Sequence, residues 1–156
     1  EYLKVMFDRS EGKIPVLDRK HEKQVQDFCR ELIQKGLISS AHDCSEGGLA
    51  IAAAESCFSY GGETFGATLT LESTLRNDTL LFGETQSRIV VSFPEERINE
   101  IEDLAMAFPV DFSLIGKVGG THYTINVNGK EIVKQEINIL KELWKTSLGN
   151  YAGQVT

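Results

Sequence analysis

Residues 123–134 read YTINVNGKEIVK, and this stretch decides the class of fold. Apolar residues at 123, 125 and 127 alternate with polar ones, which is the period of a half-buried strand. The Asn128-Gly129 pair that follows tolerates the two positive φ angles of a type I′ turn, and such a turn joins antiparallel strands. The stretch therefore predicts a β-hairpin late in the chain.

Upstream of the hairpin, segments with the period of a strand alternate with segments of helical period. We expect strands over 37–41, 65–71, 87–93 and 112–117, and helices over 18–35, 49–58, 95–107 and 137–147. Helices separate the early strands, and the hairpin closes the sheet. The predicted fold class is therefore α+β (mixed α/β), with one mixed sheet and helices packed largely on one side.

Local signals indicate where several elements end and which faces they bury. Asp18 is the expected N-cap of the first long helix, and Gly36 is its stop. Apolar residues at 25, 28, 29, 32 and 33 form the predicted buried stripe of that helix. The run Ile89-Val90-Val91 indicates a strand buried on both faces. Two glycines at 61 and 62 are expected to end the helix over 49–58.

The chain is expected to hold one domain. Residues 1–17 are predicted to be a lead-in segment from a preceding domain, residues 18–148 the domain itself, and residues 149–156 a flexible tail. The first residue is Glu rather than Met, which favours a chain cut from a longer protein.

The composition is that of a globular domain, with 156 residues, 41% hydrophobic and 25% charged. Its 16 basic and 23 acidic residues give a net charge of −7, which argues against a nucleic-acid partner. No apolar run approaches about 18 residues, so no membrane partner is expected. The three cysteines, at 29, 44 and 57, lack the close spacing of a disulfide framework or a zinc site, which favours a cytoplasmic protein.

The first candidate site lies in HDCSEGGL, residues 42–49. Asp43 and Ser45 directly follow a predicted strand, and Gly47 and Gly48 open the next helix. Backbone N–H groups and the positive end of the helix dipole bind phosphates at such a junction, and a neighbouring carboxylate such as Asp43 can hold Mg²⁺. The alternative is that Ser45 or Asp43 caps the helix and that the glycines serve a tight turn.

The second candidate site lies in FGETQSR, residues 82–88, which leads into the predicted buried strand. Glu84, Thr85 and Gln86 offer a carboxylate, a hydroxyl and an amide, a mixture that suits hydrogen bonds to sugar hydroxyls or a phosphate better than acid–base catalysis. The alternative is a polar loop that satisfies its own backbone, with Arg88 paired to a neighbouring acid.

Other polar features favour structural roles. Glycines in the stretch GKVGG, residues 116–120, are expected to form a turn, with approach to a ligand as the alternative. His42 is expected to be held by local hydrogen bonds, with a role as a ligand or base as the alternative. Cys44 lacks the basic neighbours that activate a thiol. We therefore predict no catalytic residue in this chain.

Three stretches together, AHDCSEGGLA at 41–50, LFGETQSR at 81–88 and IGKVGG at 115–120, resemble the C-terminal domain of the phosphoribosylformylglycinamidine synthase family. The resemblance covers nearly the whole chain. It implies the C-terminal-domain fold of the aminoimidazole-ribonucleotide-synthetase-like superfamily, in which two N-type and two C-type domains form one synthetase.

The resemblance also implies a function, as a fragment of a purine-biosynthesis ligase. That ligase uses ATP, Mg²⁺ and glutamine-derived ammonia to convert formylglycinamide ribonucleotide to formylglycinamidine ribonucleotide. The implied partners are the N-type and C-type domains of the same synthetase, a glutaminase that is a separate subunit or a fused domain, and the small-molecule nucleotide substrate. A C-type domain without a nucleotide-binding N-type domain is expected to be inactive alone.

The same resemblance assigns roles to the residues of both candidate sites. It matches Asp43 to a Mg²⁺ ligand and Ser45 to a serine beside a bound nucleotide, ATP or ADP. Together with the phosphate-binding junction described above, the expected nucleotide-binding positions are Ser45, Gly47 and Gly48. The segment that contacts substrate or phosphate is Glu84, Thr85 and Gln86.

Two other functions stay open. One is a domain of a related ATP-dependent synthetase, such as selenophosphate synthetase or a hydrogenase-maturation protein, against which the segment ETQSR at 84–88 favours the purine enzyme. The other is a non-catalytic interaction domain. A synthetase domain is expected to expose an apolar face that a partner domain covers, whereas a fully polar surface would favour the interaction domain.

Overall fold

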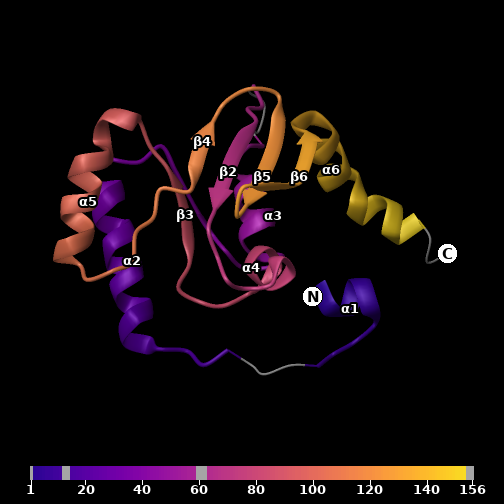
Figure 1. The fold of residues 1–156 in the computed structure, drawn as a ribbon, viewed down its shortest axis with the longest axis horizontal. Coiled ribbons are helices and arrows are strands. Elements are labelled where there is room, and N and C mark those ends of the chain that lie inside the picture. Colours follow the sequence, from indigo (N-terminus) through magenta and orange to yellow (C-terminus); the bar gives the residue numbers. More distant parts are fainter. Residues whose placement is uncertain (1, 12–14, 59–62, 154–156) are drawn as a thin grey trace. The chain divides into compact units, whose positions relative to one another are not determined.

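The computed structural model describes residues 2–11, 15–58 and 63–153, which form two compact units (Figure 1). The first unit comprises residues 1–53 and 75–114, and the second comprises residues 54–74 and 115–156. Each unit contains helices and strands, so the predicted α+β class is confirmed. The predicted domain limits at 18 and 148 stay a prediction, and the glycines at 61 and 62 lie outside the described residues.

The first unit combines helices with a two-stranded sheet. Its helices are α1 (Tyr2–Phe7), α2 (Arg19–Gln34), α4 (Asn77–Phe82) and α5 (Ile98–Ala107), with the 3₁₀ helix η1 (Glu95–Arg97) before α5 and most of α3 (Gly48–Glu55). Strands β1 (Ser40–Asp43) and β3 (Ile89–Ser92) pair antiparallel, with Asp43 opposite Ile89. This pairing ends β1 beside the start of β3.

The core of the first unit lies between α2 and α5, which run side by side (Figure 1). The buried side chains of this core are Phe28, Leu32, Leu37, Ile101 and Ala105. Each large apolar side chain buried in this way contributes about 1.5–3 kcal/mol. The core therefore fixes the position of α2 within the unit.

The second unit is a four-stranded mixed sheet followed by a long helix. Its elements are β2 (Ala67–Leu71), β4 (Gly116–Val118), β5 (His122–Val127), β6 (Lys130–Glu136) and α6 (Ile137–Gly153). The strand order is β4-β2-β5-β6, in which β2 and β5 are parallel and the other pairs are antiparallel. Alternate residues of β2 and β5 are buried, as the period of two requires.

Several local predictions are confirmed. The Asp18 carboxylate accepts hydrogen bonds from the N–H groups of Lys20 (2.9 Å) and His21 (3.1 Å), which caps α2. Gly36, just after α2, has a φ of 64°. The predicted hairpin is β5 and β6, and its turn residues have φ angles of 50° at Asn128 and 75° at Gly129.

Over the described residues, the strands are divided between two sheets, where the sequence predicted one. The strand expected over 112–117 is the shorter β4, which pairs with β2 in the second unit. β3 is half-buried along its whole length rather than buried on both faces, because in the described residues it pairs only with β1. Ile33 of α2 is 58% exposed because α2 buries the narrower stripe that faces α5.

Three helical segments also differ from the predictions. The lead-in segment contains α1, and α4 was not foreseen, since six residues are too few for a helical period to be recognised. Residues 149–153 continue α6 where a flexible tail was expected. Within the described residues, none of the helices has the length and apolar character that crossing a bilayer requires.

Replacing Asp18 with Ala is expected to lower the urea midpoint of the chain at pH 7, because the replacement removes the cap of α2. The hydrogen bonds from His21 and Lys20 lower the pKa of Asp18 below its usual value. A lowered pKa in the folded state gives stability that is present above the unfolded-state pKa and lost as pH falls through the folded-state pKa. The difference in urea midpoint between wild type and Asp18→Ala should therefore be smaller in acid than at pH 7.

Asp18→Asn is the matched control, because its amide oxygen accepts hydrogen bonds but does not titrate in this range. Its midpoint should stay above that of Asp18→Ala at both pH 7 and about pH 3. If the urea midpoint of wild type exceeded that of Asp18→Ala by more in acid than at pH 7, the assignment of Asp18 as an ionised cap would be contradicted.

Ile125→Ala is expected to destabilise the chain by about 2–5 kcal/mol, because it leaves a cavity in a packed sheet. Ile125 is 0% exposed and lies in β5 opposite Leu69 and Val133. Ile139→Ala removes the same atoms at a position that is 47% exposed and should cost less than about 1 kcal/mol. If urea denaturation gave Ile125→Ala and Ile139→Ala the same loss in free energy of unfolding, the second unit would not be packed around β5.

Candidate functional site

The end of β1 lies against the start of β3 in the first unit. The N–H group of Cys44 donates to the carbonyl oxygen of Arg88 over 2.9 Å. This bond extends the ladder by one step beyond the pair of Asp43 and Ile89. Strand pairing therefore brings both candidate sites of the first unit together.

Two glycines allow the backbones to approach closely at this point. Gly47 and Gly48 have positive φ angles of 76° and 64°. A Cβ on Gly48 would lie 2.7 Å from the carbonyl oxygen of Gly83 and 2.9 Å from that of Leu81, so a larger residue does not fit. The two glycines therefore serve a tight turn and a close backbone contact.

The carboxylate that meets the start of α3 belongs to Glu84. The N–H group of Gly47 donates to Glu84 Oε1 over 3.0 Å, although the two residues are 37 positions apart. The N–H group of Gly48 donates to the backbone carbonyl of Ser45 over 3.2 Å. Both glycine amides are thus engaged within the chain. We call the contact of Cys44, Gly47 and Gly48 with Gly83, Glu84 and Arg88 the crossing.

The loop after Glu84 is anchored at its far end. Arg88 Nη1 donates to the carbonyl oxygen of Gly83 (3.1 Å) and to Thr85 Oγ1 (3.3 Å), rather than to the neighbouring acid that one alternative expected. The Ser87 hydroxyl donates to Glu22 Oε2 over 2.5 Å. The loop is therefore held both by its own arginine and by α2.

Four of the predicted ligand contacts are exposed beside the crossing. We call them the exposed quartet: Asp43, Ser45, Thr85 and Gln86. The side chain of Asp43 is 73% exposed. Glu84 is half-buried and Gly48 is buried. The predicted site residues thus divide into exposed polar groups and groups that build the crossing.

The neighbours of Asp43 have local roles. His42 Nδ1 lies 2.8 Å from the Asp43 carbonyl oxygen and 3.9 Å from Asp43 Oδ1, so His42 is held by local contacts as predicted. Cys44 is buried, and burial raises the pKa of its thiol. Arg88 is a basic neighbour, where the sequence predicted none, but burial outweighs its charge, and a thiol with a raised pKa is a poor nucleophile at neutral pH.

The exposed quartet offers one carboxylate to a metal ion. Within the part of the chain that the structure describes, no group of three or more His, Cys, Asp or Glu side chains could hold a metal ion. Mg²⁺ is commonly bound by one or two carboxylates together with phosphate oxygens and water. Asp43 therefore fits a Mg²⁺ ion that arrives with a nucleotide.

The third glycine stretch forms a turn in the second unit, as predicted. Gly119 and Gly120, between β4 and β5, have positive φ angles of 149° and 72°. The backbone of Gly66 forms hydrogen bonds with both of these glycines. A Cβ on Gly116 would lie 2.1 Å from the carbonyl oxygen of Thr68.

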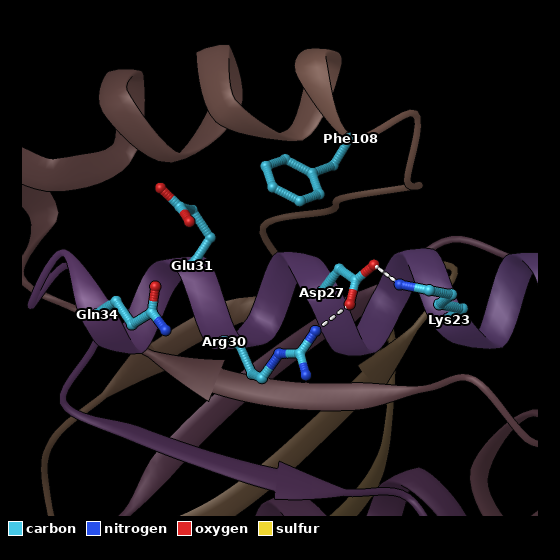
Figure 2. A pocket seen from close by; sticks show the side chains of 6 residues that line it. All are labelled: Lys23, Asp27, Arg30, Glu31, Gln34 and Phe108. Atoms are coloured by element: carbon cyan, nitrogen blue, oxygen red, sulfur yellow. Dashed lines mark hydrogen bonds and ion pairs between the residues drawn. The ribbon is translucent and has the colours of Figure 1, made fainter.

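A shallow pocket of about 410 Å³ lies beside α2 (Figure 2). Its lining residues are Lys23, Asp27, Arg30, Glu31, Gln34 and Phe108. Asp27 pairs with both Lys23 and Arg30, and these pairs lower the pKa of Asp27. Because its main charges neutralise one another, this pocket is a weaker candidate than the crossing.

Sequence reasoning missed Glu22 as part of the candidate site. Its partner Ser87 is 65 positions away in the sequence, and no local pattern connects the two residues. Gln26 Nε2 donates to Glu22 Oε1 over 2.5 Å, a pairing of positions i and i+4 that is common on any exposed helix.

The comparisons with known proteins agree with this fold. The family model described as AIR synthase related protein, C-terminal domain, matches residues 1–128. The phosphoribosylformylglycinamidine synthase subunit PurL of Thermoanaerobacter pseudethanolicus is 39% identical over 145 residues, which are 93% of this chain and 19% of the relative. The chain thus spans about a fifth of the length of this relative.

Solved structures share the fold at lower identity. The structure titled "T. maritima PurL complexed with ATP" is 21% identical with a TM-score of 0.72, over 83% of this chain and 23% of that one. The structure titled "T. maritima PurL complexed with FGAR" is 21% identical with a TM-score of 0.70, over 88% of this chain and 24% of that one. By its match to the family model over residues 1–128, the chain belongs to the AIR synthase related protein, C-terminal domain family.

Proposed function

We propose that the chain is the C-terminal domain of the ATP-dependent ligase that converts formylglycinamide ribonucleotide and glutamine-derived ammonia to formylglycinamidine ribonucleotide in de novo purine biosynthesis. The observation that carries the proposal is the 39% identity to a PurL subunit over 93% of the chain. A match of that extent includes both segments of the crossing.

The site's chemistry supports binding rather than catalysis by this domain. In the proposed ligase, Asp43 would hold Mg²⁺ together with nucleotide phosphates, and the Ser45 hydroxyl would donate to a phosphate oxygen. Bound Mg²⁺ would neutralise phosphate charge. The Thr85 hydroxyl and the Gln86 amide supply further hydrogen bonds to the sugar or phosphate of a ligand.

The remaining predicted site residues build the framework for these contacts. Glu84 is held by the Gly47 amide, and Gly48 permits the close approach to Gly83. A preformed framework of this kind lowers the entropic cost of binding, because the ligand need not order the loop. We therefore assign Gly47, Gly48 and Glu84 to positioning the exposed quartet against a nucleotide or substrate.

Exposed apolar side chains support a domain of a larger enzyme over a free-standing interaction domain. Four side chains of α1 are between 40% and 76% exposed: Leu3, Val5, Met6 and Phe7. A cluster of this kind normally marks a surface that another domain covers. We infer that the partners are the N-type and C-type domains of the synthetase and its glutaminase, in the cytoplasm, and that this domain is inactive alone.

Asp43→Asn in the full-length synthetase is expected to lower the affinity for Mg²⁺-nucleotide by at least about tenfold, since removing even a group that supports a metal ligand costs that much. Asp111→Asn is the matched control, an equally small change at an exposed carboxylate outside the site. The amount of nucleotide retained after gel filtration and the affinity in calorimetry measure the effect, with the thermal midpoint checked in parallel.

An unchanged affinity in Asp43→Asn would remove Asp43 from the site. The wider proposal would fail if the full-length protein formed no formylglycinamidine ribonucleotide from its substrate, ATP and a source of ammonia. These two results are independent, because product formation in the wild type does not depend on which domain holds the Mg²⁺.

A further inference from the structure

Ser87 has an unusual backbone for its residue type. Its φ angle is 64°, in the left-handed region that serine rarely occupies. It lies between the Glu84-Thr85-Gln86 segment and the first residues of β3. Residues held in this region cluster at ligand-binding sites, and they persist because surrounding contacts hold them there.

The contact that holds Ser87 comes from α2. Glu22 Oε2 accepts the Ser87 hydroxyl over 2.5 Å, and Glu22 Oε1 accepts the Gln26 amide over 2.5 Å. The hydrogen bond from Ser87, followed by that from Gln26, lowers the pKa of Glu22 below its usual value. The carboxylate is thus ionised and engaged through both of its oxygens.

Along the chain, the two anchored residues, Glu84 and Ser87, flank the two exposed residues of the loop. Glu84 is held by the Gly47 amide before the exposed pair of Thr85 and Gln86, and Ser87 is held by Glu22 after it. A loop fixed on both sides presents the residues between its anchors in one arrangement. Arg88 adds a contact to Thr85 Oγ1 (3.3 Å), but the hydrogen bond to Glu22 is the one that engages the Ser87 side chain itself.

We propose that Glu22 is a positioning residue of this site, which acts through Ser87 to hold Thr85 and Gln86 in the orientation that binds a phosphate-bearing ligand. The inference rests on the proposed function, because it takes Thr85 and Gln86 as ligand contacts. Glu22 itself is not a ligand contact. α2, whose place is fixed by the core, thereby contributes to a site formed by β1, α3 and the loop before β3.

The test uses the full-length synthetase, with Michaelis constants measured for formylglycinamide ribonucleotide and for ATP. Glu22→Ala and Ser87→Ala are each expected to raise one of these constants by about fivefold with kcat little changed, the effect of one lost hydrogen bond. The constant that rises identifies which of the two ligands the loop contacts. The Michaelis constant of the double variant should be no higher than that of either single variant, because both substitutions remove the same contact.

Conservative variants separate positioning from general stability. Glu22→Gln retains an oxygen that can accept the Ser87 hydroxyl and should restore most of the affinity. Glu31→Ala is the matched control, since Glu31 lies on the same helix and pairs with Lys35 at 3.5 Å. It should change neither Michaelis constant. The thermal midpoint of each variant is measured alongside.

Glu22→Ala and Ser87→Ala with unchanged Michaelis constants and a lowered thermal midpoint would overturn the proposal, since Glu22 would then be a structural contact alone. Thr85→Val and Gln86→Ala distinguish this failure from a failure of the proposed function. If they raise a Michaelis constant while the Glu22 variants do not, only the positioning role fails. If they too have no effect, the assignment of the loop to a ligand fails.

Discussion

The close passage of Gly48 over the backbone of Gly83 is the constraint on which the candidate site depends. A Cβ at residue 48 would lie 2.7 Å from the Gly83 carbonyl oxygen, so the two chain segments meet here only because residue 48 has no side chain. The β1–β3 ladder brings the segments into register, and the hydrogen bond from Gly47 to Glu84 joins them. Each exposed polar residue of the site lies within two positions of this crossing.

The crossing explains why the same short segments contain both glycines and polar residues. Glycine permits the approach, Glu84 meets an amide at the start of α3, and the remaining polar groups stay exposed. The Gly47 amide and one Glu84 oxygen are used in an internal hydrogen bond, whereas the exposed groups keep donors or acceptors for a ligand: Thr85 accepts from Arg88 but still has its O–H to donate. The division assigns framework roles to Gly47, Gly48 and Glu84 and leaves the exposed quartet for binding.

Local signals predicted the parts of the fold that depend on local physics. The Asp18 cap and the Asn128-Gly129 turn were predicted because each acts within a few residues. The stretches at 42–49 and 82–88 were recognised from their residue types. Their joining, and the link from Glu22 to Ser87, depend on strand register and on where α2 packs, which no sequence period reveals. The division of the strands into two sheets was missed for the same reason.

The proposed function requires that a phosphate-bearing ligand binds at the crossing in this domain. Hydrogen–deuterium exchange of the full-length synthetase, with and without Mg²⁺-ADP or formylglycinamide ribonucleotide, tests it most directly. At least one of these ligands is expected to slow exchange in this domain at residues 43–48 and 84–88, with little change across β5 and β6. Unchanged exchange in both segments with either ligand, in an enzyme that binds both, would contradict it.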